Sequence, residues 1–173
     1  MTNHYIPQLS TIKEVIKHTD LEYTFRMTFD GVAKPGQFFE VSIPKYGEAP
    51  ISVSGIGEGT IDFTIRRVGK VTNEIFENYV GDQFFIRGPY GNGFSIENYR
   101  NKELVIIAGG TGLSPVRGVV DYFAHHTEEA VSTTLIAGFK SPKDVLFKDD
   151  FKFWNEHIEV IKTVDTATEG YDG

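Results

Sequence analysis

The hydrophobic pattern of the chain changes its period near Tyr99, and this change limits what each half can fold into. Before it, apolar and polar residues alternate in short runs separated by turns that contain glycine or proline, as in half-buried β-strands. Leu21, Tyr23 and Phe25 show this spacing in residues 21–30. After it, short apolar runs alternate with amphipathic helical stretches, a pattern typical of a β-α-β-α-β unit.

Six short strands and one brief helix in residues 71–80 predict a six-stranded antiparallel Greek-key barrel for the first half. The second half predicts a partial doubly wound parallel sheet of βαβαβ order. The boundary between them is expected between Phe94 and Lys102, with one domain at 1–98 and the other at 99–173.

Residues 104–108 form a wholly apolar strand, which predicts burial on both faces. A doubly wound sheet places this strand at its centre, so with nothing after Gly173 it becomes an uncovered apolar edge. We therefore expect the chain to be a fragment of a longer protein.

Composition excludes several classes of protein. The 173 residues carry a formal net charge of −7, and no Lys/Arg cluster is long enough to follow a nucleic-acid backbone. The chain has no cysteine, so no thiolate nucleophile or cysteine-ligated cluster is expected in it, and no metal site is predicted. The N-terminus lacks an apolar signal core and no run reaches membrane-spanning length, which predicts a cytoplasmic protein that does not interact with membranes.

The stretch Gly109–Pro115 lies between an apolar strand and a helix, where a phosphate-binding loop is expected. Ser114 is expected as the N-cap of that helix and Pro115 as its first residue. The dinucleotide fingerprint fails here, because Pro115 replaces its last glycine when the pattern is read from Gly110. A tight strand–helix turn without a ligand is therefore the alternative.

A second candidate anion site lies at Gly69–Thr72. Gly69 precedes a helix that Thr72 is expected to cap, and Arg66 and Arg67 lie just upstream. A hydroxyl, free helix N–H groups and two arginines suit a phosphate. A capped helix beside two solvated arginines is the alternative.

A third stretch, "APISVSG", has a proline within a strand followed by two serines. The order of the three stretches, in a barrel followed by a nucleotide fold, resembles the ferredoxin–NADP reductase superfamily. "APISVS" is similar to its R-x-Y-[ST] flavin motif, with Ala49 and Ile51 in place of the usual arginine and tyrosine. "GKVT" is similar to the flavin pyrophosphate motif, "GPYGNGF" to the segment between domains and "GGTGLSP" to the nicotinamide-side motif.

The resemblance implies an FAD-binding barrel and an NAD(P)-binding second domain. The implied FAD-binding residues are Pro50, Ile51, Ser52, Val53, Ser54, Arg66, Arg67, Gly69, Lys70, Val71 and Thr72. Ser52 would lie at the reactive flavin edge, as the catalytic position. The implied NAD-binding residues are Gly109, Gly110, Thr111, Gly112, Leu113, Pro115, Gly138 and Lys140. NADH is expected, although Lys140 and Lys143 stand where the 2′-phosphate of NADPH would be read.

Within the superfamily the chain is most similar to the electron-transfer component of anaerobic sulfite reductase. The electron-transfer subunit of dihydroorotate dehydrogenase is the alternative, but it usually keeps an arginine at the position of Ala49. The resemblance implies an enzyme component that takes hydride from NADH onto FAD and passes electrons through a [2Fe–2S] centre to other subunits of a reductase complex.

Both of these relatives hold the [2Fe–2S] centre in a C-terminal cysteine cluster. Because this chain has no cysteine, we expect that centre only in the full-length protein, and we expect this chain to reduce flavin slowly with NADH. The departures at Ala49 and Ile51 leave a non-catalytic nucleotide-binding regulatory module open as a different class of function.

Overall fold

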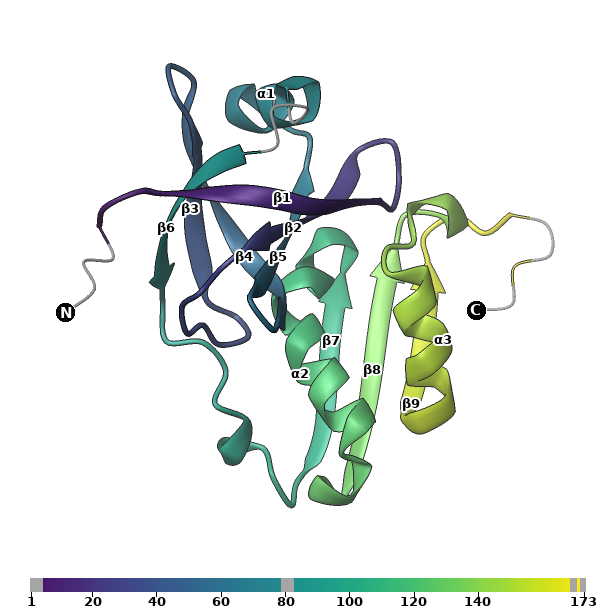
Figure 1. Cartoon of the computed structure of the whole chain (residues 1–173). Helices are drawn as coiled ribbons and strands as arrows, with labels where there is room; N and C mark the ends of the chain where they lie inside the picture. The colour runs from purple at the N-terminus through teal and green to yellow at the C-terminus, as the bar shows by residue number, and fades with distance from the viewer. Residues whose placement is uncertain (1–4, 79–82, 169–170, 172–173) are drawn as a thin grey trace.

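The computed structural model describes residues 5–78, 83–168 and 171, and shows a closed barrel followed by a parallel sheet with helices (Figure 1). Neighbouring barrel strands pair antiparallel in the order β1-β2-β5-β4-β3-β6, which confirms the predicted barrel. The barrel strands are β1 (Gln8–Lys17), β2 (Glu22–Thr28), β3 (Phe38–Ile43), β4 (Gly47–Gly57), β5 (Thr60–Arg66) and β6 (Gln83–Tyr90).

Aromatic side chains fill the barrel, as the alternating pattern of its strands predicts. The Phe25 ring packs edge-on against Phe84, and Phe39 packs edge-on against Phe63, with ring centroids 5.5 and 5.4 Å apart. Helix α1 (Lys70–Asn78) joins β5 to β6 and packs Ile75 against this core. The barrel is therefore a filled core, and a ligand must bind on its outside.

The α/β unit, residues 103–164, contains three parallel strands in the order β7-β8-β9, as predicted. Figure 1 shows the carboxyl ends of these strands pointing toward the barrel. No helix among the described residues is long and apolar enough to cross a membrane. The elements of this unit are β7 (Glu103–Gly109), α2 (Leu113–His125), β8 (Ser132–Phe139), α3 (Lys148–His157) and β9 (Glu159–Val164).

The prediction that the β7 strand is buried on both faces is wrong for this chain. Val105 and Ile107 are 63% and 72% exposed, whereas Ile106 and Ala108 pack toward α2 and α3. Crossovers between neighbouring parallel strands are right-handed, which places both helices on the same face of the sheet. The opposite face has no covering helix among the described residues.

The helix that follows β8 does not begin at Pro142, although a proline is common in the first turn of a helix. Pro142–Asp144 forms only a short 3₁₀ turn, η5, and α3 begins at Lys148. Phe147 precedes it with a left-handed backbone, φ 53°. The chain therefore turns sharply at Phe147, and this turn brings the start of α3 against the barrel.

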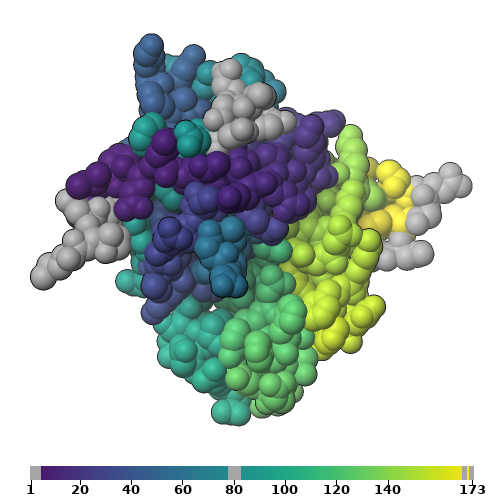
Figure 2. Space-filling model, in the orientation of Figure 1, coloured from purple at the N-terminus to yellow at the C-terminus, as the bar shows by residue number. Residues whose placement is uncertain are grey.

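Helix α2 joins the two parts of the molecule, because it packs on β7 and β8 with one face and on β4 of the barrel with another. Gly118 allows this approach, since an added Cβ would lie 3.0 Å from the Pro35 ring. The space-filling view shows the barrel in purple and blue resting directly on the green and yellow α/β unit (Figure 2). Residues on both sides of this contact can thus contribute to one site.

Candidate functional site

A cavity of about 350 Å³ lies where the barrel meets the carboxyl ends of the parallel strands. Ligands of open α/β sheets bind at this end, because the loops after the strands converge there. The barrel contributes Arg66 and Glu22, and the α/β unit contributes predicted site residues. The lining is Leu21, Glu22, Arg66, Gly109, Gly110, Gly138, Phe139, Lys140, Asp144 and Asp165.

The glycine-rich loop forms a 3₁₀ turn, η3 (Gly110–Gly112), between β7 and α2. Gly110 has φ +51°, a conformation that glycine adopts at little cost. An added Cβ at Gly110 or Gly112 would meet no atom within 4 Å. Thr111 is half-buried beside them. The loop therefore presents bare backbone to the space in front of it.

The expected cap of α2 is wrong. The helix begins at Leu113 with Gly112 as its N-cap, so Ser114 is the second residue of the helix and Pro115 the third. The 3₁₀ turn occupies the positions just before Leu113, and the helix starts directly after it. Leu113 is fully buried in the core of the α/β unit, so its side chain cannot contact a ligand there.

Ser114 has a buried hydroxyl that finds no hydrogen-bond partner among the described residues. It lies one turn before Arg117 and Gly118, which both contact the barrel, so it faces the same side of α2. A buried unsatisfied polar group is uncommon in folded proteins and requires an explanation. A bound ligand with a polar group at the start of α2 would supply one.

The predicted flavin stretch lies on β4, where burial separates its residues into two groups. Pro50 is exposed and Ser52 half-buried, so both can contact a ligand on the barrel surface. Ile51 is half-buried and packs partly against the barrel core, which leaves only part of its side chain accessible. Val53 belongs to the barrel core. Ser54 is fully buried, and its hydroxyl donates to the Asp62 carbonyl on the side of the barrel that the α/β unit covers. The side chains of Val53 and Ser54 are therefore both buried away from a ligand.

At the second predicted anion site, α1 begins at Lys70, so Thr72 is the third helical residue and not its N-cap. Its Oγ1 accepts hydrogen bonds from the N–H groups of Val68 and Gly69, at 3.0 and 2.9 Å. An added Cβ at Gly69 would meet nothing within 4 Å. The N–H groups of Lys70 and Val71, in the first turn, have no acceptor within the helix. Thr72 thus shapes the turn, and a phosphate would bind the backbone.

The two arginines before α1 point to different places. Arg66 forms an ion pair with Glu22 at 2.9 Å and lines the cavity beside the glycine-rich loop. Arg67 pairs with Glu77 of α1 at 2.6 Å and lies outside that cavity. The sequence does not distinguish these two candidate phosphate ligands, but the structure does: Arg66 lies next to the glycine-rich loop and Arg67 next to α1.

Two predicted residues of the α/β unit, Gly138 and Lys140, line the same cavity, near the end of β8. Lys140 is exposed, and Lys143 lies in the η5 turn. Sequence reasoning missed Asp144 and Asp165, which line the same cavity. Their place in the sequence could have identified them, since both lie in segments that follow the carboxyl end of a parallel strand.

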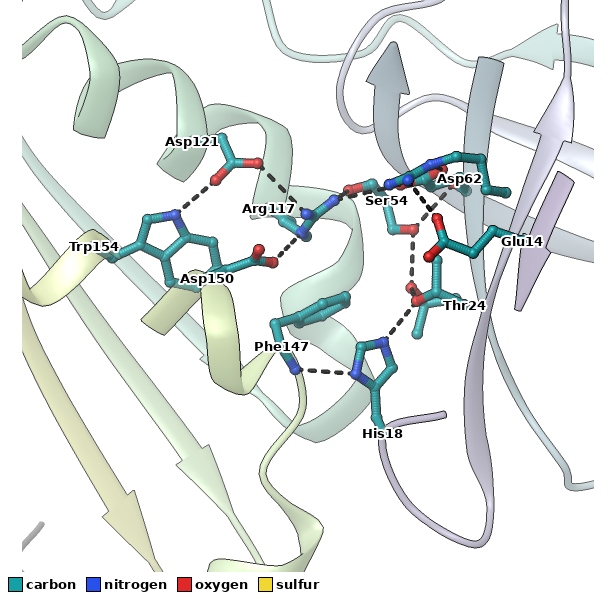
Figure 3. A network of polar contacts seen from close by, with 12 residues as sticks. Glu14, His18, Thr24, Ser54, Asp62, Arg117, Asp121, Phe147, Asp150 and Trp154 are labelled. Carbon is teal, nitrogen blue, oxygen red and sulfur yellow. Dashed lines mark hydrogen bonds and ion pairs between the residues drawn. The ribbon is translucent and has the colours of Figure 1, made fainter. Parts of the chain in front are cut away.

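Sequence reasoning also missed a polar network that crosses the contact between barrel and α/β unit (Figure 3). Arg117 of α2 donates to the Ser54 carbonyl at 2.9 Å and to Asp150 of α3 at 2.6 Å. A second cavity of about 450 Å³, between the β1–β2 hairpin and α3, is lined by Arg117 and His18. It contains none of the predicted site residues. The only hint in the sequence is an arginine within the apolar helix Val116–Ala124.

Comparison with known proteins supports this architecture. Residues 106–173 match the family described as oxidoreductase NAD-binding domain. The gamma subunit of sulfhydrogenase 2 from Pyrococcus furiosus is 39% identical over 145 residues, covering 83% of this chain and 49% of that protein. A probable dihydroorotate dehydrogenase B (NAD(+)) electron transfer subunit from Thermoplasma volcanium is 32% identical over 162 residues, covering 94% of this chain and 58% of that protein.

The solved ferredoxin reductase in carbazole 1,9a-dioxygenase matches 97% of this chain and 53% of its own, with a TM-score of 0.81 and 24% identity. The chain therefore has the fold of this ferredoxin reductase, and its residues 106–173 resemble an oxidoreductase NAD-binding domain. It spans about half the length of the curated relatives that it matches. The open space at Gly69, Gly110 and Gly112 leaves room for a phosphate-bearing ligand at the backbone of these glycines.

Proposed function

We propose that this chain is the cofactor-binding part of an NADH-dependent flavin electron-transfer subunit, which takes hydride from NADH onto FAD. The observation that carries the proposal is the shared cavity in which Arg66 of the barrel meets Gly109 and Gly110 of the nicotinamide-side loop. A hydride donor and its acceptor must be held in contact. This arrangement supports two cofactors that meet between the barrel and the α/β unit.

On the barrel side, Pro50, Ile51 and Ser52 would hold the flavin ring, because these are the accessible residues of the flavin stretch. Ser52 would place its hydroxyl at the reacting edge, where it can donate a hydrogen bond. Ile51 offers an aliphatic contact in place of a stacking ring. The backbone at Gly69–Val71 would bind the pyrophosphate through free N–H groups. Bound flavin would supply the chemistry of accepting a hydride and releasing electrons singly.

On the α/β side, the bare backbone of Gly110 and Gly112 would approach the nicotinamide dinucleotide closely, at the start of α2. NADH is favoured over NADPH, because Asp144 and Asp165 line the cavity near Lys140. Two carboxylates repel a 2′-phosphate, whereas they can accept hydrogen bonds from ribose hydroxyls. Lys140 alone would not balance both carboxylates.

The electrons would pass to a partner reductase. The relatives' names, a sulfhydrogenase gamma subunit and a dihydroorotate dehydrogenase B electron transfer subunit, support a place in a multi-subunit complex. Anaerobic sulfite reductase stays our first candidate for the partner, on the motif resemblance. A dihydroorotate dehydrogenase is the second candidate, favoured by the probable electron transfer subunits among the relatives. The proposal places the [2Fe–2S] centre outside these 173 residues, because they contain no cysteine.

Anaerobic mixing of the FAD-loaded chain with NADH tests the function. We expect the visible flavin bands to bleach slowly, as the sequence predicts for this chain. Ser52→Ala should slow bleaching a further tenfold or more, since it removes a hydrogen-bond donor at the reacting edge. Ser52→Thr is the matched control, because it keeps the hydroxyl. Bound FAD that NADH never bleaches would overturn the redox proposal and support the non-catalytic nucleotide-binding module.

A further inference from the structure

The guanidinium of Arg117 makes a polar contact between α2 and strand β4 of the barrel. It donates to the Ser54 carbonyl of β4 and to Asp150 of α3, and it lies 3.8 Å from both Asp62 and Asp121. Its side chain is only 15% exposed. This side chain thus combines a largely buried charge with partners from both parts of the molecule.

The barrel partner of Arg117 is an irregular point of β4. Val53 pairs with Phe63 and Gly55 with Asp62, so the register shifts at Ser54 and the strand carries a β-bulge there. A bulge leaves one residue of the strand outside the regular ladder and redirects its neighbours. Arg117 donates a hydrogen bond to the Ser54 carbonyl at this bulge, so a residue of the α/β unit contacts the irregular point of β4.

A second path ties Ser54 to the α/β unit through its hydroxyl (Figure 3). Ser54 Oγ accepts from Thr64 Oγ1 at 2.9 Å, and Thr64 Oγ1 lies 2.7 Å from Thr24 Oγ1. Thr24 in turn bonds His18, whose Nδ1 accepts the N–H of Phe147. The backbone carbonyl and the side chain of one bulge residue are thus each linked to the α/β unit.

Gly55 shows how closely Arg117 is seated. A Cβ added at Gly55 would lie 2.7 Å from Arg117 Nη1 and 2.8 Å from Asp62 Oδ2. The absence of a Cβ at Gly55 leaves the room that the guanidinium occupies beside the bulge. Ser52, the accessible serine of the flavin stretch, lies two residues before Ser54 on the same strand.

The geometry points to Arg117 as a positioning residue that sets the shape of β4, and with it the place of Ser52, only when the α/β unit is docked on the barrel. This inference rests on the proposed function, because it makes the shape of the flavin-binding strand depend on contact with the nicotinamide-side unit. Arg117 thereby couples the flavin-binding strand to the helix that follows the nicotinamide-side loop, in addition to the path through the Ser54 hydroxyl.

The test compares Arg117→Met, Arg117→Lys and Gly55→Ala in the 173-residue chain. Arg100→Met is the matched control, because Arg100 pairs with Glu129 and Tyr122 away from β4. Backbone amide NMR spectra recorded without any cofactor report changes in the backbone geometry at Ser52. Titration with FAD measures whether such a change alters FAD affinity.

We expect the Ser52 and Ser54 amide signals to move in Arg117→Met and Gly55→Ala but not in Arg100→Met. FAD affinity should fall about tenfold in the first two and less in Arg117→Lys, which keeps the charge but not the forked geometry. Unmoved amide signals, or moved signals with FAD affinity within about twofold of wild type, would overturn the inference.

Arg117→Met leaves several carboxylates without their cation and can prevent folding. Gly55→Ala then decides the matter through the Ser52 amide signal and the FAD affinity, because Ser54 is its direct neighbour and its signal moves with any substitution there. The added Cβ would press on the Arg117 guanidinium and on the Asp62 carboxylate while removing no charge. Should the unmodified chain bind no FAD, the proposed function fails, whereas the amide signals still decide whether Arg117 sets the shape of β4.

Discussion

The Nδ1 atom of His18 in the barrel accepts a hydrogen bond from the backbone N–H of Phe147 in the α/β unit, at 3.3 Å. An N–H group can only donate, so Nδ1 carries no proton in this contact. The neutral ring then carries its proton on Nε2, which lies 2.7 Å from Thr24 Oγ1 and donates to it. The contact between the two parts therefore requires the neutral form of His18.

This requirement predicts a pH-dependent stability. Burial lowers the pKa of His18 from 6.5 to about 4, with Arg117 and Lys148 acting in the same direction and Asp150 opposing them. Between these values the unfolded chain binds a proton that the folded chain does not, so the free energy of unfolding falls as the pH falls from 6.5 to about 4. The contribution of His18 is fully present above the upper value.

Urea unfolding of the wild type and His18→Asn across this range checks the prediction. Asparagine keeps an acceptor for the Phe147 N–H but does not titrate. The stability advantage of the wild type should therefore shrink as the solution is acidified. An advantage that stays constant throughout would contradict the role assigned to His18.

The two outer residues of the η3 turn should respond differently to alanine. Gly110 has φ +51° and Gly112 has φ −63°, while an added Cβ meets no atom at either. Gly110→Ala should cost about 1 kcal/mol of unfolding free energy from backbone strain, whereas Gly112→Ala should be neutral or slightly stabilising. Thermal unfolding of the pair measures this. Equal losses would show that φ at Gly110 is not the constraint.

The hydroxyl of Thr72, more than the volume of its side chain, should stabilise the turn before α1. Thr72→Val keeps the shape but removes the acceptor of the Val68 and Gly69 N–H groups, and we expect a loss of about 1 kcal/mol. FAD affinity should fall with it, because the backbone at Gly69 loses its geometry. Thr72→Ser should restore both. Chemical unfolding and an FAD titration of the three chains provide the measurement, and a fully stable valine variant would count against the assignment.

Substitution of the two arginines before α1 should have different effects on NADH binding. Arg66→Gln removes a cation from the cavity beside Gly109 and should weaken NADH binding about tenfold. Arg67→Gln removes the exposed contacts with Glu77 and Asn73 of α1 and should leave NADH binding nearly unchanged, since exposed pairs contribute little. Isothermal titration with NADH compares the two variants, and a reversed order of effects would move the nicotinamide site away from this cavity.

The architecture could be predicted from the sequence because hydrophobic period is a local signal. Alternation in residues 21–30 and the apolar runs after Tyr99 predicted the barrel and the parallel sheet correctly. The start of α2 could not be predicted in this way. Ser114 and Pro115 form a good cap sequence, but the glycines before them turn into η3 and shift the helix start to Leu113.

The network between the two parts could not be predicted, because its members share no local pattern. His18, Asp62 and Arg117 are separated by 44 and 55 residues and meet only after the α/β unit has docked. Each is typical of a solvated surface residue in its own segment. The candidate cofactor-binding residues were easier to predict, since glycine-rich loops and helix starts form short contiguous motifs. Burial nevertheless removes the side chains of Val53, Ser54 and Leu113 from contact with a cofactor.

A flavin bound to the outside of the barrel at β4 is the feature on which the proposed function depends most directly. A titration of FAD with the purified chain, followed by visible absorbance and flavin fluorescence, tests this claim. We predict saturable binding of one FAD per chain with shifted visible bands, weakened by Gly69→Val, which fills the open space at the start of α1. An unperturbed FAD spectrum at high chain concentration would contradict flavin binding at this barrel.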